Sequence, residues 1–171
     1  MAGHEENVLL EDARIIFRNF AGNETQYNPA GRRNFSVVLT PEVADKLEKE
    51  GWNVKRKPPR EEGDDELCHL PVTVSFKGIP PRLYMITKSK KRRTMLDEET
   101  AELLDYAELE LVDVIIRPYD WEVNGNTGRK AYVKTLYATI REDELDLKYA
   151  DVQDDGQTPR IPDDDEGGDL E

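Results

Sequence analysis

Cationic and aromatic side chains alternate along one stretch of the sequence. Lys130, Tyr132 and Lys134 stand two residues apart, so in an extended strand they would share one face. Tyr119 and Trp121 have the same spacing a short way upstream. Cations neutralise phosphates, and flat rings stack on unpaired bases at about 1–3 kcal/mol per base. The pattern therefore predicts a surface that binds single-stranded nucleic acid.

Other segments carry the same two residue types. Tyr84 and Lys88 share one face of a further predicted strand, and the predicted loop from Lys88 to Arg93 carries five positive charges. Rings also pack in β-sheet cores, and a run of lysines can be a solvated loop, so the pattern leaves open which rings stack. The predicted nucleic-acid contacts are Arg32, Arg33, Tyr84, Lys88, Lys90, Lys91, Arg92, Arg93, Tyr119, Trp121, Lys130, Tyr132 and Lys134.

Patterns that would indicate catalysis are weak. Cys68 and His69 are adjacent, but no CxxC or HxxxH spacing accompanies them, and the glycine-rich phosphate loop and GxSxG motifs do not occur. Carboxylates are plentiful, so a metal-dependent nuclease stays open as a hypothesis. We predict a protein that is not an enzyme, with no catalytic residues, no metal site and no cofactor.

Negative charge is concentrated at the C-terminal end. The whole chain carries −13, while residues 142–171 hold 13 acidic side chains against Lys148 and Arg160, a net −11. The rest of the chain is nearly neutral and can present a basic face. A tethered polyanion can compete for such a face or dock partner proteins, and it can also be a simple solubiliser. The predicted partner-binding residues of this tail are Asp163, Asp164, Asp165, Glu166 and Asp169.

Length and composition indicate one domain with an unpacked end. The chain has 171 residues, of which 37% are hydrophobic and 36% charged. We expect a domain over residues 1–150 and disorder over residues 151–171, where too little apolar surface is available to offset the entropy of ordering. A single cysteine, no signal-peptide pattern and no long apolar run favour a cytoplasmic protein without membrane contact.

The elements that would position the site are mostly strands. Helices are predicted over residues 41–50, with Thr40 as cap and Gly51 as stop, and over residues 97–107 with Leu103 and Leu104 buried. A hairpin turn is predicted over residues 124–128, and Pro118 suggests a bulge or an edge position. The predicted strands span residues 8–20, 33–39, 71–77, 82–88, 109–123 and 130–140. Such an order favours a mostly antiparallel, closed or partly open barrel.

Four segments together resemble a known family. They are Tyr27–Phe35, Thr40–Glu42, Ile115–Gly125 and Lys130–Thr135. The chain resembles phage-encoded single-stranded-DNA-binding proteins that have an OB-like barrel and an acidic C-terminal tail. The resemblance implies an OB-like antiparallel barrel over residues 1–150. It also implies a protein that coats single strands during phage DNA replication and recombination in the host cytoplasm, with replication or recombination proteins as partners through the tail.

One departure and one alternative function accompany this resemblance. Tails of that class often end in an aromatic residue, whereas this sequence ends in Leu170-Glu171. The lopsided acidity also fits an inhibitor that binds a host protein by imitating nucleic acid. Preference for DNA over RNA and the oligomeric state, including a homodimer, are left open by the sequence.

Overall fold

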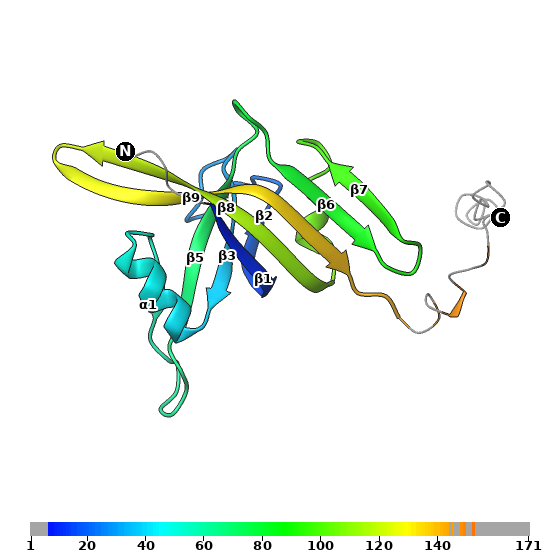
Figure 1. Ribbon diagram of the computed structural model, residues 1–171, viewed down its shortest axis with the longest axis horizontal. Helices are drawn as coiled ribbons and strands as arrows, with labels where there is room; N and C mark the ends of the chain where they lie inside the picture. The colour runs from blue at the N-terminus through cyan, green and yellow to red at the C-terminus, as the bar shows by residue number, and fades with distance from the viewer. Residues whose placement is uncertain (1–6, 144, 146–147, 150–151, 153–171) are drawn as a thin grey trace, which may run out of the picture.

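A computed structural model describes residues 7–143, 145, 148, 149 and 152 of the chain (Figure 1). The predicted tail therefore falls almost entirely outside the described residues. The described part contains two short helices and nine strands, more than the predicted six. The elements are β1 (Val8–Ala13), β2 (Ile15–Asn19), β3 (Arg33–Leu39), α1 (Pro41–Lys49), β4 (Lys55–Lys57), β5 (Leu67–Val74), β6 (Arg82–Thr87), β7 (Arg92–Leu96), α2 (Leu103–Tyr106), β8 (Leu109–Val123) and β9 (Asn126–Ile140).

The strands form one mixed sheet whose backbone is the β8–β9 hairpin. The hydrogen-bonded order is β1-β8-β9-β5-β3-β2. Along its other edge β9 pairs in parallel first with β5 and then with β6, while β7 and β4 extend the sheet from β6 and β5. The remaining pairs are antiparallel. The sheet is curled but not closed, so the predicted fold class, a mostly β, OB-like barrel, is confirmed in its partly open form.

The predicted strand over residues 8–20 is wrong in one respect, because it is two strands. The chain breaks at Arg14: β1 pairs with β8 at one end of the sheet, and β2 pairs with β3 at the other. Asp12 and Phe17 have φ angles of 52° and 54°, which interrupt regular extended backbone. This one segment therefore spans the opening of the curled sheet.

Helix α1 forms as predicted. The Thr40 side chain accepts a hydrogen bond from the Val43 N–H, Pro41 occupies the first turn, and the chain leaves the helix through Gly51 at a φ of 95°. Ala44 and Leu47 are buried on the core side. The helix covers the end of the sheet formed by β3 and β5 (Figure 1).

The predicted second helix is mostly a turn. Asp97 caps the backbone N–H groups of Glu99 and Thr100, but only Leu103–Tyr106 are helical. Leu104 is buried as predicted, whereas Leu103 is 47% exposed. A side-chain cap satisfies backbone donors in a turn as well as in a helix, so the cap alone did not set the helix length.

The hairpin turn is tighter than predicted. Val123 pairs with Asn126, which leaves Asn124 and Gly125 as a two-residue turn. Both have positive φ, 54° and 82°, as a type I′ turn requires. The return strand therefore begins at Asn126 rather than Lys130, and the tip of the hairpin extends well beyond the rest of the sheet (Figure 1). Pro118 lies beyond the last residue of β8 that pairs with β1, which is an edge position as predicted.

The core lies inside the curl of the sheet. Alternate residues of β3, β5, β8 and β9 are buried there, among them Val37, Val72, Val114 and Leu136. Phe35 stacks on another buried ring from the end of β2, with centroids 5.1 Å apart. Within the described residues no helix is long and apolar enough to cross a membrane. The intervening residues of the same strands point outward and form the surface considered next.

Candidate nucleic-acid interface

The outward face of the β8–β9 hairpin gathers aromatic and cationic side chains. In the strand register Tyr119 lies opposite Lys130, and Trp121 lies opposite Gly128. The rings of Tyr119 and Tyr132 are 5.7 Å apart and tilted by 54°. The structure thus places these predicted residues side by side, and their contact with nucleic acid stays a prediction.

Arg117 belongs to the same group but was not predicted. It lies opposite Tyr132, and its guanidinium carbon is 4.9 Å from the centre of that ring. The two-residue spacing of Arg117, Tyr119 and Trp121 was the signal that could have identified it, because such spacing places side chains on one face of a strand.

Gly128 determines how Trp121 lies. A Cβ atom at Gly128 would be 2.5 Å from the indole Cζ2. The indole therefore lies directly on the glycine backbone across the hairpin, where any larger residue would displace it. Trp121 is half-buried in this position, and it keeps one side of the hairpin aromatic up to the tip.

The outward surface continues from the hairpin onto β5 and β3. Tyr132 pairs with Thr73, which in turn pairs with Asn34. These residues line a depression of about 330 Å³, which we call the central groove. Its lining includes Phe17, Arg32, Asn34, Thr73, Lys130 and Tyr132. Arg32 and Lys130 are exposed and Tyr132 is half-buried, so two exposed cations and a ring line the same depression.

A second depression of about 440 Å³ adjoins the central groove. Arg32 and Thr73 line both, and Lys77 extends the second one further along the sheet. Arg33 also lines it, but its side chain is only 18% exposed and has structural partners. Its guanidinium donates to the Phe20 carbonyl at 2.6 Å and lies 3.8 Å from a Glu98 oxygen. A phosphate contact by Arg33 therefore stays a prediction with competing partners.

A separate aromatic cluster lies over β6 and β9. Tyr84 stacks on Tyr137 with centroids 5.0 Å apart and planes at 17°. The Arg93 guanidinium carbon is 4.7 Å from the centre of the Tyr84 ring. Tyr137 was not predicted, because its spacing from Tyr132 fits one face only when the bulge of β9 is known. Lys134 is the extra residue of that bulge, since Ile116 pairs with Val133 and Ile115 with Thr135, and it is exposed.

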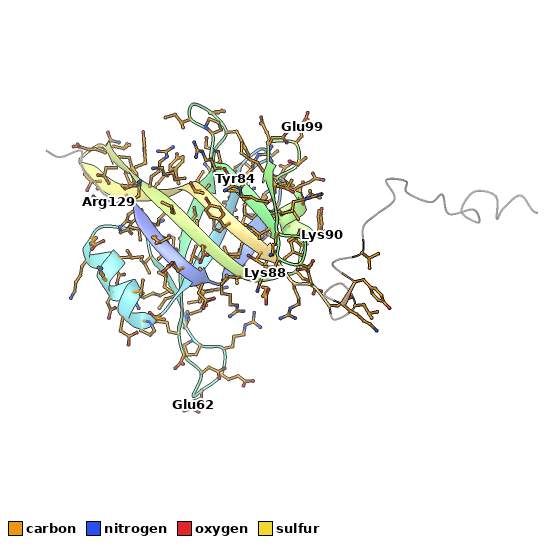
Figure 2. All side chains as sticks on the ribbon, turned by 45° about the vertical axis from the view of Figure 1, so that its right-hand side comes forward. Glu62, Tyr84, Lys88, Lys90, Glu99 and Arg129 are labelled. Atoms are coloured by element: carbon orange, nitrogen blue, oxygen red, sulfur yellow. The ribbon has the colours of Figure 1, made fainter. Side chains whose placement is uncertain are left out.

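The predicted basic loop is shorter than expected. Arg92 and Arg93 belong to β7, so only residues 88–91 form the turn. Lys88 and Lys90 project from this end of the β6–β7 hairpin (Figure 2). Lys88 lies 3.8 Å from Glu110, and the Ser89 hydroxyl and N–H donate to Glu142 just after β9. Those bonds lower the pKa of the Glu142 carboxyl, so it stays charged beside the cations.

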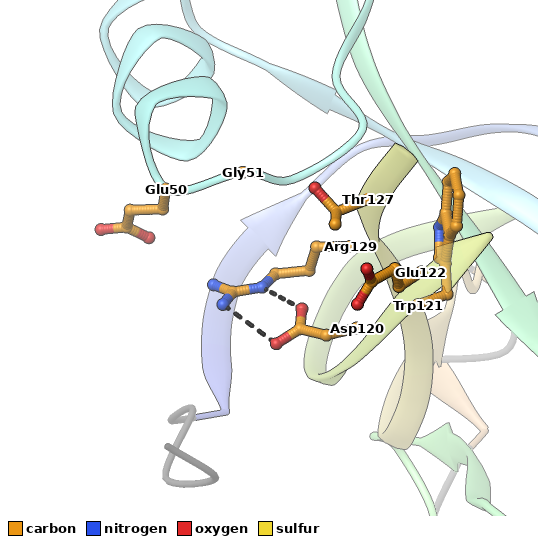
Figure 3. A pocket seen from close by; sticks show the side chains of 8 residues that line it. Glu50, Gly51, Asp120, Trp121, Glu122, Thr127 and Arg129 are labelled. Carbon is orange, nitrogen blue, oxygen red and sulfur yellow. Dashed lines mark hydrogen bonds and ion pairs between the residues drawn. The ribbon is translucent and has the colours of Figure 1, made fainter. Parts of the chain in front are cut away.

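The most voluminous of these depressions lies toward the tip of the hairpin, where Trp121 and Gly128 line it together with Asp120, Glu122, Thr127 and Arg129. It measures about 510 Å³ and lies between the hairpin and the end of α1 (Figure 3). Asp120 accepts hydrogen bonds from the Arg129 guanidinium at 2.7 and 3.3 Å, and Glu50 and Glu122 add negative charge. Because carboxylates repel phosphates, this depression is a poorer nucleic-acid site than the central groove.

Phe17 and His69 form an unexpected pair at the rim of the central groove. Phe17 is 54% exposed, and its left-handed backbone costs a non-glycine residue about 1–2 kcal/mol. Its ring meets the His69 ring edge-on at 5.4 Å. His69 is buried, and its Nδ1 has no hydrogen-bond partner. Burial lowers the pKa of His69, and Lys57 and Lys55 lower it further.

This lowered pKa predicts an acid-sensitive fold. Free histidine has a pKa near 6.5, so below that pH the unfolded chain binds a proton that native His69 resists. The free energy of unfolding is therefore undiminished by His69 above that pH, and it decreases as the pH falls toward the pKa of native His69. We expect the free energy of urea unfolding to decrease more between pH 7.5 and 5.5 in the wild type than in His69→Gln. Equal decreases would show that His69 does not control this dependence.

Among the described residues no group of three or more His, Cys, Asp or Glu side chains could hold a metal ion. Burial raises the pKa of the Cys68 thiol, so it is protonated at neutral pH. The side chains that gather on the outward face are instead those that bind phosphates and bases.

Comparisons with known proteins identify solved structures with a similar fold and the family of the chain. No curated protein sequence is detectably similar to the chain. The single-stranded DNA-binding protein of bacteriophage Enc34 in complex with ssDNA has a similar fold, with 7% identity over 80% of this chain and 88% of that chain and a TM-score of 0.52. A C-terminal truncation of that protein gives 7% identity, coverage of 80% and 87%, and a TM-score of 0.50. The model of the putative phage ssDNA-binding domain matches residues 2–167. The chain therefore belongs to the family of putative phage ssDNA-binding domains.

Proposed function

We propose that this protein binds single-stranded DNA without strong sequence preference. The observation that carries the proposal is the central groove, which exposed Arg32 and Lys130 line together with the half-buried ring of Tyr132. Phosphate contacts and base stacking are available in every sequence, so this arrangement binds strands rather than particular bases. The family assignment and the fold shared with a protein solved on ssDNA support the same reading.

The biological role that follows is protection of exposed strands. A non-enzymatic protein of this kind coats single strands during phage DNA replication and recombination, in the cytoplasm of the host. Binding without turnover needs a long, open, cationic surface rather than an enclosed reaction site. The adjoining depressions that share Arg32 and Thr73 provide such a surface.

A salt-dependent titration with oligo-dT tests this proposal. Trp121 lies on the outward face near Tyr119, whereas Trp52 is only 4% exposed, so bound bases should quench mainly Trp121 fluorescence. We expect tight binding at low salt that a duplex competitor does not displace. Trp121→Phe should remove most of the signal change while leaving affinity measurable by anisotropy of a labelled strand. Absence of binding at low salt would overturn the proposed function.

We further propose that the acidic tail competes for this surface and docks replication or recombination proteins. Residues 151–171 carry nine acidic side chains and only Arg160, a net −8. A tethered polyanion has a high effective concentration near a cationic groove.

Truncation after Ala150 should therefore tighten oligo-dT binding severalfold at about 0.05 M salt, with the difference shrinking as added salt screens the tail. Titrations of the full and truncated chains at several salt concentrations measure this. Equal affinities at low salt would leave the tail without a competing role.

A further inference from the structure

The basic segment at residues 55–57 has an arrangement that the central groove does not explain. It forms the short edge strand β4, which pairs with β5. Its middle residue, Arg56, is bound by carboxylates of Asp45 and Glu48 at 2.9 Å and of Glu66 at 3.2 Å. Lys55 and Lys57 alternate with it and are exposed, so they point to the other side of the strand.

Phe17 connects these lysines to the central groove. The Lys57 ammonium lies 5.5 Å from the centre of the Phe17 ring. The same ring lines the central groove together with Lys130 and Tyr132. A strand lying in the groove would therefore meet Phe17 before it reached β4.

The exposure of Phe17 is the second observation. A bulky apolar residue in left-handed backbone is unusual, and such outliers cluster at functional sites. Its ring is nevertheless held in place by the edge-on contact with His69 and by Lys57. A fixed ring with one open side loses little entropy when a base stacks on it.

We propose that the DNA-binding surface continues from the central groove across Phe17 onto β4. In this arrangement Phe17 stacks a base, and Lys55 and Lys57 bind the phosphates beyond it. The proposal rests on the proposed function, because it extends the same surface by one subsite. It also gives the charge pattern of β4 a reason: three carboxylates neutralise Arg56, while neither lysine has an ion pair among the described residues.

The sequence after β4 sets the end of this subsite. Glu61, Glu62, Asp64 and Asp65 follow within the β4–β5 loop. Glu62 projects far from the sheet at the tip of that loop (Figure 2). These charges repel phosphates, so the strand is expected to end its contact at β4.

Two groups of variants test the subsite in the full chain. Lys55→Gln/Lys57→Gln should reduce the slope of log affinity against log salt by about 1.4, because each single-strand phosphate contact contributes about 0.7. It should also shorten the oligo-dT length at which affinity stops rising. Phe17→Leu should weaken oligo-dT binding by about 5-fold or more, and Phe17→Trp should restore it and add a quenched fluorophore.

Lys46→Gln/Lys49→Gln is the matched control, since it removes two exposed lysines from α1 nearby. Thermal unfolding establishes that each variant is folded. If the wild type binds and the β4 variant matches the α1 control in slope and length dependence, the subsite is wrong while the proposed function stands. If the wild type does not bind oligo-dT at all, the proposed function fails and the subsite fails with it.

Discussion

Replacing Tyr132 by alanine is expected to weaken oligo-dT binding by about 5- to 150-fold. The reason is that loss of one stacked base costs about 1–3 kcal/mol, and each 1.4 kcal/mol is about tenfold in affinity. Tyr132 lies at the centre of the interface, between the guanidinium of Arg117 at 4.9 Å and the ring of Tyr119 at 5.7 Å. It also lines the central groove with Lys130. Anisotropy of a labelled oligo-dT strand measures the change.

Tyr106→Ala provides the control for this experiment. Tyr106 is 74% exposed in α2 and does not line the central groove. Tyr106→Ala makes the same change of residue type as Tyr132→Ala, but it should leave the affinity for oligo-dT unchanged within experimental error. Tyr132→Phe should retain most of the affinity, because the ring rather than the hydroxyl stacks. An equal, small effect of both alanine variants would show that Tyr132 only packs against its neighbours.

The long strands and the first helix could be predicted because their signals are local. The segment Leu109–Val123 is rich in β-branched and aromatic residues, which favour a strand. The motif Thr40-Pro41-Glu42 indicates a helix N-terminus from residues within a single turn. In both cases the residues that decide the structure are neighbours in sequence. Tertiary contacts therefore reinforced local preference instead of overriding it.

The elements that were missed are determined by distant partners. Residues 8–20 divide because the two halves pair with opposite ends of the sheet, and the Asp113 carboxylate accepts the Asp12 N–H at the distortion. Strands β4 and β7 are rich in lysine and arginine, residues with no marked strand preference. They are extended because β5 and β6 supply the hydrogen bonds. No local pattern contains that information.

The candidate site was predicted in part for the same reason. A two-residue spacing places Tyr119 and Trp121 on one face without further knowledge. Phe17 was assigned to a regular strand, so its exposure through left-handed backbone could not be anticipated. Tyr137 is related to Tyr132 through a bulge, and Asn34 and Lys57 reach the surface through pairings with β5. Sequence therefore predicted the hairpin residues of the candidate interface and Arg32, whereas Phe17, Asn34 and Lys57 became apparent only from the topology.

Replacing Arg32 and Lys130 together by glutamine is expected to weaken binding by about 25-fold at 0.1 M salt, because each lost single-strand phosphate contact removes about 0.7 from the salt slope. Arg32 directly precedes β3 and Lys130 lies within β9, yet both line the central groove, and both are exposed. The expected slope change is about 1.4, and the affinities should converge near 1 M salt, where counterion release no longer favours binding. Titrations of the labelled strand across a range of salt measure both quantities.

In this double variant the salt slope distinguishes the loss of phosphate contacts from a loss of folded protein. A variant that was merely destabilised would lose active protein at every salt concentration, which lowers apparent affinity without flattening the salt dependence. The Lys46→Gln/Lys49→Gln variant loses the same net charge from α1 and should keep the wild-type slope apart from a small long-range contribution. An unchanged slope in Arg32→Gln/Lys130→Gln would remove the central groove from the path of the strand. The cations of the β6–β7 hairpin, with the Tyr84–Tyr137 stack beside them, would then be the next surface to test.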